Sequence, residues 1–293
     1  MQVRLIINAD DFGLTPGINR AIAELHDAGA VTSATLMATG PAFDDAVALA
    51  QARPSLGVGC HIVLVDGTPV SDPATIPTLL GPDRRTFRNS LGDFALGVLR
   101  GAIRQDHIQR EALAQIQQLQ RAGLKLTHVD THKHTHLLSR VARPIIRALD
   151  DSGIRSIRNP FEPGWAATLG GSTRRSLFVR AFGPGRRRFE ASPPIASRRI
   201  LTTRGTVGIS ATGHLNSTTL RDLLKAIPDG TWELVCHPGY NDSDLDAITT
   251  RLRTERETEL RTLLAFPKSL LPSMNPSGLR LIHYGELDSW FVS

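Results

Sequence analysis

Short apolar runs alternate along this chain with longer stretches in which apolar residues recur every three or four positions. The first apolar run, residues 5–7, is followed closely by the adjacent acidic residues Asp10 and Asp11. A short apolar run bounded by turn residues is typical of a buried strand in a parallel sheet. Next, Thr15 and Pro16 have the residue types of a helix N-cap and a first helical position. The pattern therefore predicts a strand followed by a helix.

The same alternation continues through most of the chain and predicts one architecture. Residues 65–104 are expected to be a long loop followed by a helix. Strands that alternate with helices favour a parallel sheet with right-handed crossovers. With about seven or eight strands, we expect an α/β fold, a single distorted β/α (TIM-like) barrel over residues 1–293, and an open doubly wound sheet is the alternative. The other expected strands are 31–37, 56–64, 124–130, 154–157, 207–211, 232–236 and 279–283, and the other expected helices are 16–28, 43–52, 106–122, 142–151, 217–227 and 246–264.

One segment departs from this alternation because it is strongly basic. Residues 151–206 contain eleven arginines and three acidic residues, whereas the whole chain carries a net charge of only +6. A helix is expected at 172–182, with Leu177, Phe178 and Phe182 apolar, and a run of three arginines follows at 186–188. We therefore expect an Arg-rich insertion at about 165–206. It is either a solvated face or a surface for anionic lipid headgroups, phosphates or nucleic acid.

The composition narrows the class of protein. A content of 41% hydrophobic and 21% charged residues is that of a soluble globular protein, and no segment approaches the roughly 18 consecutive apolar residues of a membrane span. The N-terminus leads directly into the first strand, without the pattern of a signal peptide. Two cysteines provide no disulfide framework. We expect a cytoplasmic protein, peripheral at the inner face of the membrane if the basic segment binds lipid.

The densest group of polar residues is THVDTHKHTH at 127–136. His128, Asp130, His132, His134 and His136 alternate strictly, so in an extended chain they would all project to the same side. A buried imidazole needs a hydrogen-bond partner, which makes such a cluster difficult to place in a core. A metal site is the simplest interpretation, and a solvated His-rich loop is the alternative.

Other candidate residues lie at the ends of different expected strands. His61 lies in the third strand, and His237 follows a strand and precedes a turn. One carboxylate and two imidazoles from separate strand ends can fill three positions of a catalytic metal and leave one open for water. Taken singly, Asp10 and Asp11 could be turn formers or helix caps, and His61 a core histidine. His237 could act as a proton donor near neutral pH or be a loop histidine.

Four motifs in order resemble one known family. They are NADDFG near the N-terminus, GCH at 59–61, THVDTHKHTH at 127–136 and CHPG at 236–239. Together they resemble the YdjC-like carbohydrate deacetylase family, of the chitooligosaccharide deacetylase or hopanoid biosynthesis-associated HpnK type. The resemblance covers most of the chain, but no family motif falls in the basic insertion. It implies a distorted β/α barrel, a single deacetylase domain, and hydrolysis of an N-acetyl group from a sugar.

The resemblance also implies roles for individual residues. By match to the family motifs, Asp11, His61 and His132 would hold one divalent metal ion, zinc or magnesium. Asp10 would be the general base and His237 the general acid. This set corresponds to the strand-end residues identified above, so the implied enzyme is a metal-dependent carbohydrate N-deacetylase, an amide hydrolase.

The resemblance says less about four further residues and about the substrate. His128, His134 and His136 are candidates for supporting or substrate-contacting roles, and Arg158 is a candidate contact to substrate. A basic, partly apolar insertion favours a lipid-borne sugar, since each arginine near an anionic membrane contributes about 1 kcal/mol. We therefore expect a glycosylated hopanoid as substrate, and the alternatives are a chitooligosaccharide deacetylase and a metal-dependent phosphoesterase. Nucleic acid is not expected, because aromatic residues are 5% of the chain and no recognition motif accompanies the charge. The oligomeric state is left open.

Overall fold

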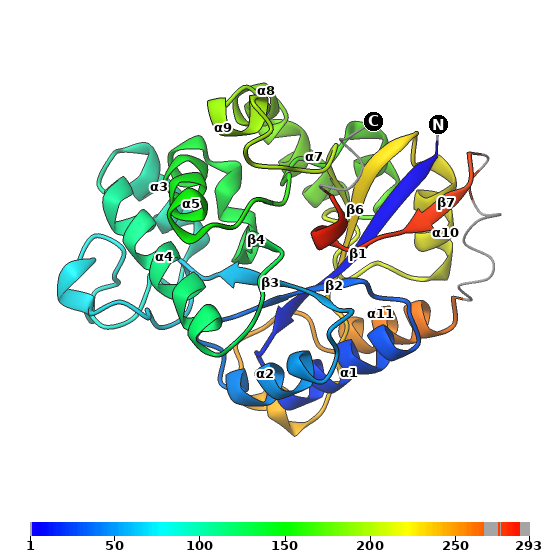
Figure 1. Cartoon of the computed structure of the whole chain (residues 1–293), viewed down its shortest axis with the longest axis horizontal. Coiled ribbons are helices and arrows are strands. Elements are labelled where there is room, and N and C mark those ends of the chain that lie inside the picture. Colours follow the sequence, from blue (N-terminus) through cyan, green and yellow to red (C-terminus); the bar gives the residue numbers. More distant parts are fainter. Residues whose placement is uncertain (1, 267–274, 276, 288–293) are drawn as a thin grey trace.

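A parallel β-sheet forms the middle of the molecule, and its central strand is β1 (Val3–Phe12) (Figure 1). This computed structural model describes residues 2–266, 275 and 277–287. The strand order is β4-β3-β2-β1-β6-β5, β7 also pairs with β1, and these strands are all parallel. The other strands are β2 (Ser33–Leu36), β3 (Gly57–Ile62), β4 (His128–Thr131), β5 (Thr206–Val207), β6 (Gly230–Cys236) and β7 (Leu279–Leu281).

Strand β1 is paired along both sides. Val3 lies opposite Gly230 of β6 and opposite Leu279 of β7, and further along Asn8 lies opposite Ser33 of β2. Nearly all residues of β1 are also buried, as in a parallel sheet with both faces covered, which explains its apolar first part. Because neighbouring strands hold β1 on each side, its carboxyl end has a fixed position in the sheet.

The sheet curls beyond β4. An isolated parallel bridge joins Val129 to Ile157, and another joins Ser156 to Leu201, which lies five residues before β5. The expected α/β class with a parallel sheet is therefore confirmed, and the curl is consistent with a distorted barrel. In the described part of the chain, these bridges stand where a regular TIM barrel would have full strands.

Helices connect the strands, as the alternating pattern predicted. The Thr15 side chain accepts a hydrogen bond from the Ile18 N–H at 3.2 Å, and Pro16 begins α1. Helices α1, α2 and α11 lie together below the sheet in Figure 1, whereas α3, α4 and α5 gather beside β3 and β4. None of the described helices is both long and apolar enough to cross a membrane. The α-helices are α1 (Pro16–Asp27), α2 (Phe43–Gln51), α3 (Leu91–Leu99), α4 (Gln105–Arg121), α5 (Ser139–Ser152), α6 (Gly164–Leu169), α7 (Thr173–Phe182), α8 (Gly185–Glu190), α9 (Pro193–Ala196), α10 (Ser217–Ala226) and α11 (Thr254–Leu264).

Some expected bounds were wrong. Helix α5 begins at Ser139, three residues earlier than expected, so Pro144 lies inside the helix rather than in its first turn. The helix expected at 246–264 consists of a 3-10 helix, η3 (Ser243–Ala247), and the shorter α11. The helix expected at 172–182 is present as α7, in a region of four short helices. The side chains of Arg174, Arg175, Phe178 and Arg180 lie outside the described residues.

Candidate active site

The candidate residues come together at the carboxyl ends of the strands. Asp10 and Asp11 lie in the last part of β1, His61 lies near the end of β3, and His132 and His237 directly follow β4 and β6. The carboxyl ends of parallel strands meet at one edge of the sheet, where ligands bind in α/β folds. The expectation that these five residues share one edge agrees with the structure.

Asp11, His61 and His132 form a compact set of ligand atoms. Asp11 Oδ1 lies 3.6 Å from His61 Nε2 and 3.4 Å from His132 Nδ1, and the two ring nitrogens are 3.3 Å apart. Ligand atoms placed about 2.1 Å from a tetrahedral ion lie about 3.4 Å from one another. The donors and their spacing therefore fit a divalent metal ion.

The backbone and a distant arginine orient Asp11. Its φ is +66°, a left-handed conformation that is uncommon for a residue other than glycine, and the β1–β2 register shifts at this point. Arg256 of α11, which is buried, donates from Nη2 to Asp11 Oδ2 at 2.6 Å. Burial would raise the pKa of Asp11, but the charge of Arg256 and the hydrogen bond with His132 hold that pKa well below its usual range. Oδ1 is therefore the oxygen of Asp11 that faces the two histidines.

Asp10 is held on both oxygens by Arg158. Arg158 donates to Asp10 Oδ2 at 2.8 Å and to Oδ1 at 2.7 Å, and the Asn8 amide donates to Oδ1 at 2.9 Å. Burial would raise the pKa of Asp10, but the charge and hydrogen bonds of Arg158 outweigh burial and hold the pKa well below its usual range. Asp10 is therefore ionised and fixed in orientation.

Arg158 connects several buried carboxylates of the site. Its guanidinium is fully buried and also contacts Asp130 at 2.5 Å and Glu233 at 2.6 Å. The earlier hypothesis that Arg158 contacts substrate does not agree with this burial. A guanidinium presents five donors in a rigid fork, which allows one arginine to orient three carboxylates.

Asp130 fixes the ring of His61. His61 Nδ1 lies 2.6 Å from Asp130 Oδ1. Burial would lower the pKa of His61, but the charge of Asp130 outweighs burial and raises the pKa to about 9. A carboxylate on one ring nitrogen orients a metal-ligating histidine and leaves the other nitrogen for the ion. Nε2 is accordingly the nitrogen that faces Asp11 and His132.

His237 lies next to Asp10 rather than within the ligand set. Its Nε2 is 3.8 Å from Asp10 Oδ2, and its backbone N–H donates to Glu259 of α11 at 2.6 Å. Burial lowers the pKa of His237 to about 4, despite the opposing charges of Asp10 and Asp11. Within the described residues its Nδ1 is buried without a hydrogen-bond partner. The ring is therefore neutral at neutral pH and able to receive a proton.

The polar residues of 128–136 do not all project to one side, because the chain leaves the extended conformation. Strand β4 ends at Thr131, and a 3-10 helix, η2 (His132–Leu137), follows with Lys133 and His134 at positive φ. Strict alternation of side chains requires an extended backbone. Of the four histidines in this segment, His132 is the one that joins Asp11 and His61.

The other histidines of the segment are in different environments. The ring of His128 stacks on Tyr284 with centroids 3.7 Å apart, and its Nε2 lies 3.1 Å from Asn8 Oδ1. His136 Nδ1 lies 2.6 Å from the hydroxyl of Thr131, and its Nε2 lies 3.2 Å from the carbonyl of Arg158. Both rings are buried and support the strand ends.

Sequence reasoning missed the contribution of α11. Arg256 and Glu259 lie three residues apart and therefore on one face of the helix. Glu259 accepts from the N–H groups of His237 and Gly213, while Arg256 holds Asp11. The spacing of the two charges was visible in the sequence, but it does not show which face of the helix meets the sheet.

This chain is similar to several known proteins. The model of a family described as YdjC-like protein matches residues 4–266. A carbohydrate deacetylase from Brevibacillus brevis is 33% identical over 97% of this chain and 100% of its own length. A carbohydrate deacetylase from Homo sapiens is 32% identical over 98% and 92%. A crystal structure from Enterococcus faecalis, 22% identical, has the same fold with a TM-score of 0.76 over 98% of this chain and 99% of that one.

Proposed function

Because this chain belongs to the family of YdjC-like proteins, we propose that it is a carbohydrate deacetylase that removes the N-acetyl group of an acetylated amino sugar in a metal-dependent reaction. The observation that carries the proposal is the placement of Asp11, His61 and His132 beside the Asp10–Arg158 pair. One group of residues can hold an ion, and the adjacent carboxylate is ionised and can accept a proton.

The ligand set would be Asp11, His61 and His132, with one divalent ion, zinc or magnesium. When bound, such an ion polarises the acetamide carbonyl and lowers the pKa of a coordinated water. Magnesium prefers oxygen ligands, whereas two imidazoles and one carboxylate suit zinc. The donor set favours zinc.

Asp10 and His237 would move the protons of the reaction. Asp10 would take the proton of the attacking water as its oxygen bonds to the acetamide carbon, before the C–N bond breaks. With its pKa held low by Arg158, Asp10 does not retain that proton, and His237 Nε2 lies 3.8 Å from its Oδ2. His237 then delivers the proton to the departing amine nitrogen, so that acetate and a free amino sugar leave.

The test is mass-spectrometric detection of deacetylation, with and without a chelator. The substrates are an N-acetylglucosaminyl hopanoid and a chitin disaccharide, and the expected result is acetate release that the chelator abolishes. His61→Ala and His132→Ala should lose both the metal and the activity. Phosphate release from phosphate esters, without acetate release from either sugar, would favour the phosphoesterase alternative instead.

For the substrate, we propose a glycosylated hopanoid lipid reached at an anionic membrane. The support is the basic region, where Arg187 and Arg188 of α8 are exposed and Leu177 of α7, ten residues before Arg187, is exposed as well. Arg186 is less available for contact with a membrane, because it pairs with Glu190 at 2.7 Å. Exposed arginines and leucines are the residues that bind membrane interfaces.

Sedimentation with anionic vesicles tests the membrane contact. Reversing Arg187 and Arg188 to Glu should weaken binding to phosphatidylserine vesicles. Reversing the exposed Arg121 and Arg221, on α4 and α10, changes the net charge equally and should leave binding nearly intact. Equal binding by both double variants, or a preference for the chitin disaccharide, would contradict the lipid substrate.

A further inference from the structure

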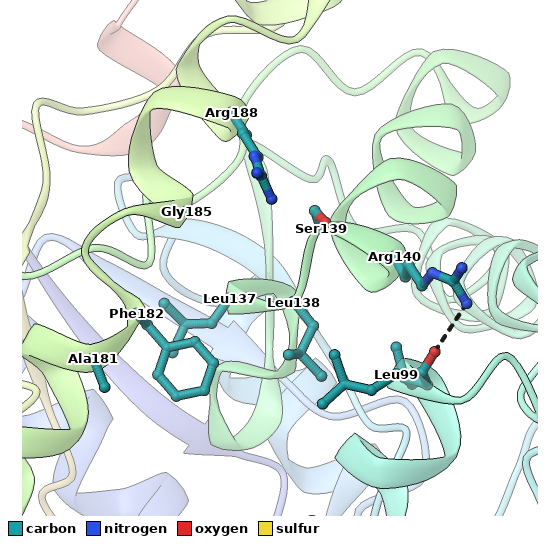
Figure 2. A pocket seen from close by; sticks show the side chains of 10 residues that line it. Leu99, Leu137, Leu138, Ser139, Arg140, Ala181, Phe182, Gly185 and Arg188 are labelled. Carbon is teal, nitrogen blue, oxygen red and sulfur yellow. Dashed lines mark hydrogen bonds between the residues drawn. The ribbon is translucent and has the colours of Figure 1, made fainter.

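An open groove lies between α3, the start of α5, and α7–α8 (Figure 2). Its volume is about 170 Å³. In Figure 2 the ring of Phe182 and the side chains of Leu137, Leu138 and Leu99 gather along its floor, while Arg188 reaches toward it from α8. Arg140, on the opposite side, donates to the Val98 carbonyl at 3.3 Å. We call this feature the α3–α7 groove.

Two residues that line the α3–α7 groove, Leu137 and Leu138, lie close in sequence to the proposed metal ligand His132. Leu137 is the last residue of η2, the 3-10 helix that begins with His132. Six residues from His132 to Leu138 span at most about 20 Å, even when fully extended. His136 ties this segment to Thr131 and to Arg158, so its position is fixed relative to the site. The part of the groove formed by Leu137 and Leu138 therefore lies within about 20 Å of His132.

Apolar side chains continue outward from the groove. Among the described residues, four large hydrophobic side chains are exposed, and two of them, Leu96 and Leu99, lie on the face of α3 near the groove. A third, Leu177, lies one helical turn before Ala181, which lines the groove. Exposed apolar side chains near an apolar groove are typical of a site for an apolar partner.

We propose that the α3–α7 groove receives the apolar aglycone of the amino-sugar substrate. This inference rests on the proposed deacetylase function. A site that encloses a whole small molecule usually has about 300–1,000 Å³, so this smaller groove takes only a part of a ligand. The leucines and Phe182 would contact the aglycone, and Arg140 and Arg188 border the groove on its two sides.

A series of alkyl N-acetylglucosaminides tests the proposal. The probes carry methyl, butyl, hexyl and octyl groups and are used as monomers with the zinc-loaded enzyme. Acetate release gives kcat/KM for each probe. We expect kcat/KM to rise with chain length, by up to about fourfold for each methylene that enters the groove, since burying a CH₂ contributes about 0.8 kcal/mol.

Two variants alter the groove without touching the metal-ligand set. Leu99→Gln makes its wall polar, and Ala181→Phe fills it from α7. Both should turn over the methyl glycoside as the wild type does but lose the dependence on chain length. Leu264→Gln changes an exposed leucine on α11 and should retain that dependence. An unchanged dependence on chain length in both groove variants would overturn the proposal, as would its absence in the wild type.

Calorimetry separates failure of the groove from failure of the proposed function. If no glycoside releases acetate, the deacetylase assignment fails, but binding of the octyl and methyl glycosides can still be compared. Tighter binding of the octyl compound, lost in Ala181→Phe, would support an apolar ligand in the groove. Equal affinity for both compounds would overturn it.

Discussion

Two adjacent aspartates of β1 are each held by a buried arginine, but in different ways. Arg158 occupies both oxygens of Asp10, whereas Arg256 donates to Oδ2 of Asp11 and leaves Oδ1 facing His61 and His132. Asp10 is thereby fixed as an ionised acceptor, and Asp11 keeps one oxygen for an ion. The comparison shows that the arginine contacts of a carboxylate, rather than its place in the motif, determine whether it is suited to accept a proton or to bind an ion.

The backbone allows both carboxylates to reach the same site. Successive residues of a strand normally project to opposite faces. Ala9 keeps the regular register with Cys236, but the positive φ of Asp11 and the register shift after Ala9 interrupt the alternation. As a result His61 lies within one cluster that contains Asp10 and within another that contains Asp11.

The largest expected effect comes from changing each aspartate to its amide. Asp11→Asn should lose the metal and with it the activity. Asp10→Asn should retain the metal, while kcat/KM falls by about 10²–10⁴, the usual contribution of a positioned acid or base. Metal content by elemental mass spectrometry and acetate release are the two measurements. Retention of metal by Asp11→Asn, or normal turnover by Asp10→Asn, would contradict the division of roles.

Removing Arg158 should lower the stability of the fold more than removing any single metal ligand. Arg158→Met leaves Asp10, Asp130 and Glu233 as buried carboxylates without their shared cation. The free energy of unfolding should fall by about 3–5 kcal/mol, as for other broken buried pairs. Urea denaturation measures this change. Arg261→Met removes an exposed arginine paired with Glu257 and should change stability by less than about 1 kcal/mol.

Glu162 is a buried carboxylate that, unlike Asp10 and Asp11, is not held by an arginine of the described residues. Glu162 accepts from the backbone N–H groups of Gly208 at 2.7 Å and Ser210 at 2.9 Å, and no arginine among the described residues is bonded to it. Burial raises its pKa to about 7, despite those hydrogen bonds. Glu162 thus differs from Asp10 and Asp11, whose arginine partners hold their pKa values below the usual range.

The raised pKa of Glu162 predicts a pH dependence of stability. A folded-state pKa above the unfolded value stabilises the protein at low pH, and this contribution is lost as the pH rises from about 4.5 to 7. The loss should be at most about 3 kcal/mol. Urea denaturation at several pH values should show a smaller decline in Glu162→Gln than in the wild type. Parallel stability curves for the two proteins would disprove this prediction.

The smallest expected effect is that of Arg256. Arg256→Met frees Oδ2 of Asp11, and the dissociation constant of the metal should rise about 10–100-fold, as when other partners of metal ligands are removed. Competition with a chromophoric chelator measures that constant independently of turnover. Arg256→Lys should recover part of the affinity, because the ammonium can still donate to Oδ2. Unchanged affinity in Arg256→Met would show that Arg256 does not position the ligand.

Local patterns predicted most of the elements, and the resemblance to the family motifs supplied the proposed ligand set. The Thr15–Pro16 cap and the apolar run before Asp10 can both be recognised from residues that are adjacent in the sequence. The topology placed the acidic pair, His61 and the histidine-rich segment at one edge, because the ends of parallel strands share an edge. The match to the family motifs then selected Asp11 and His132 from their neighbours.

The supporting residues could not be predicted, because their contacts span the chain. Arg158 lies 148 residues from Asp10, and Arg256 lies 245 residues from Asp11. Each reaches its partner through a long side chain whose direction depends on tertiary packing. The positive φ of Lys133 and His134 was equally hidden, since neither residue is a glycine.

The pairing of β7 with β1 bears on where the functional unit ends. The family match stops at residue 266, yet β7 pairs with Val3 to Leu5 of β1, and Tyr284 beyond it donates to Glu233 at 2.5 Å and stacks on His128. A chain cut at the family boundary would open one side of β1 as a free edge and leave an empty space beside the buried carboxylates. Recombinant versions of this protein should therefore extend past residue 287.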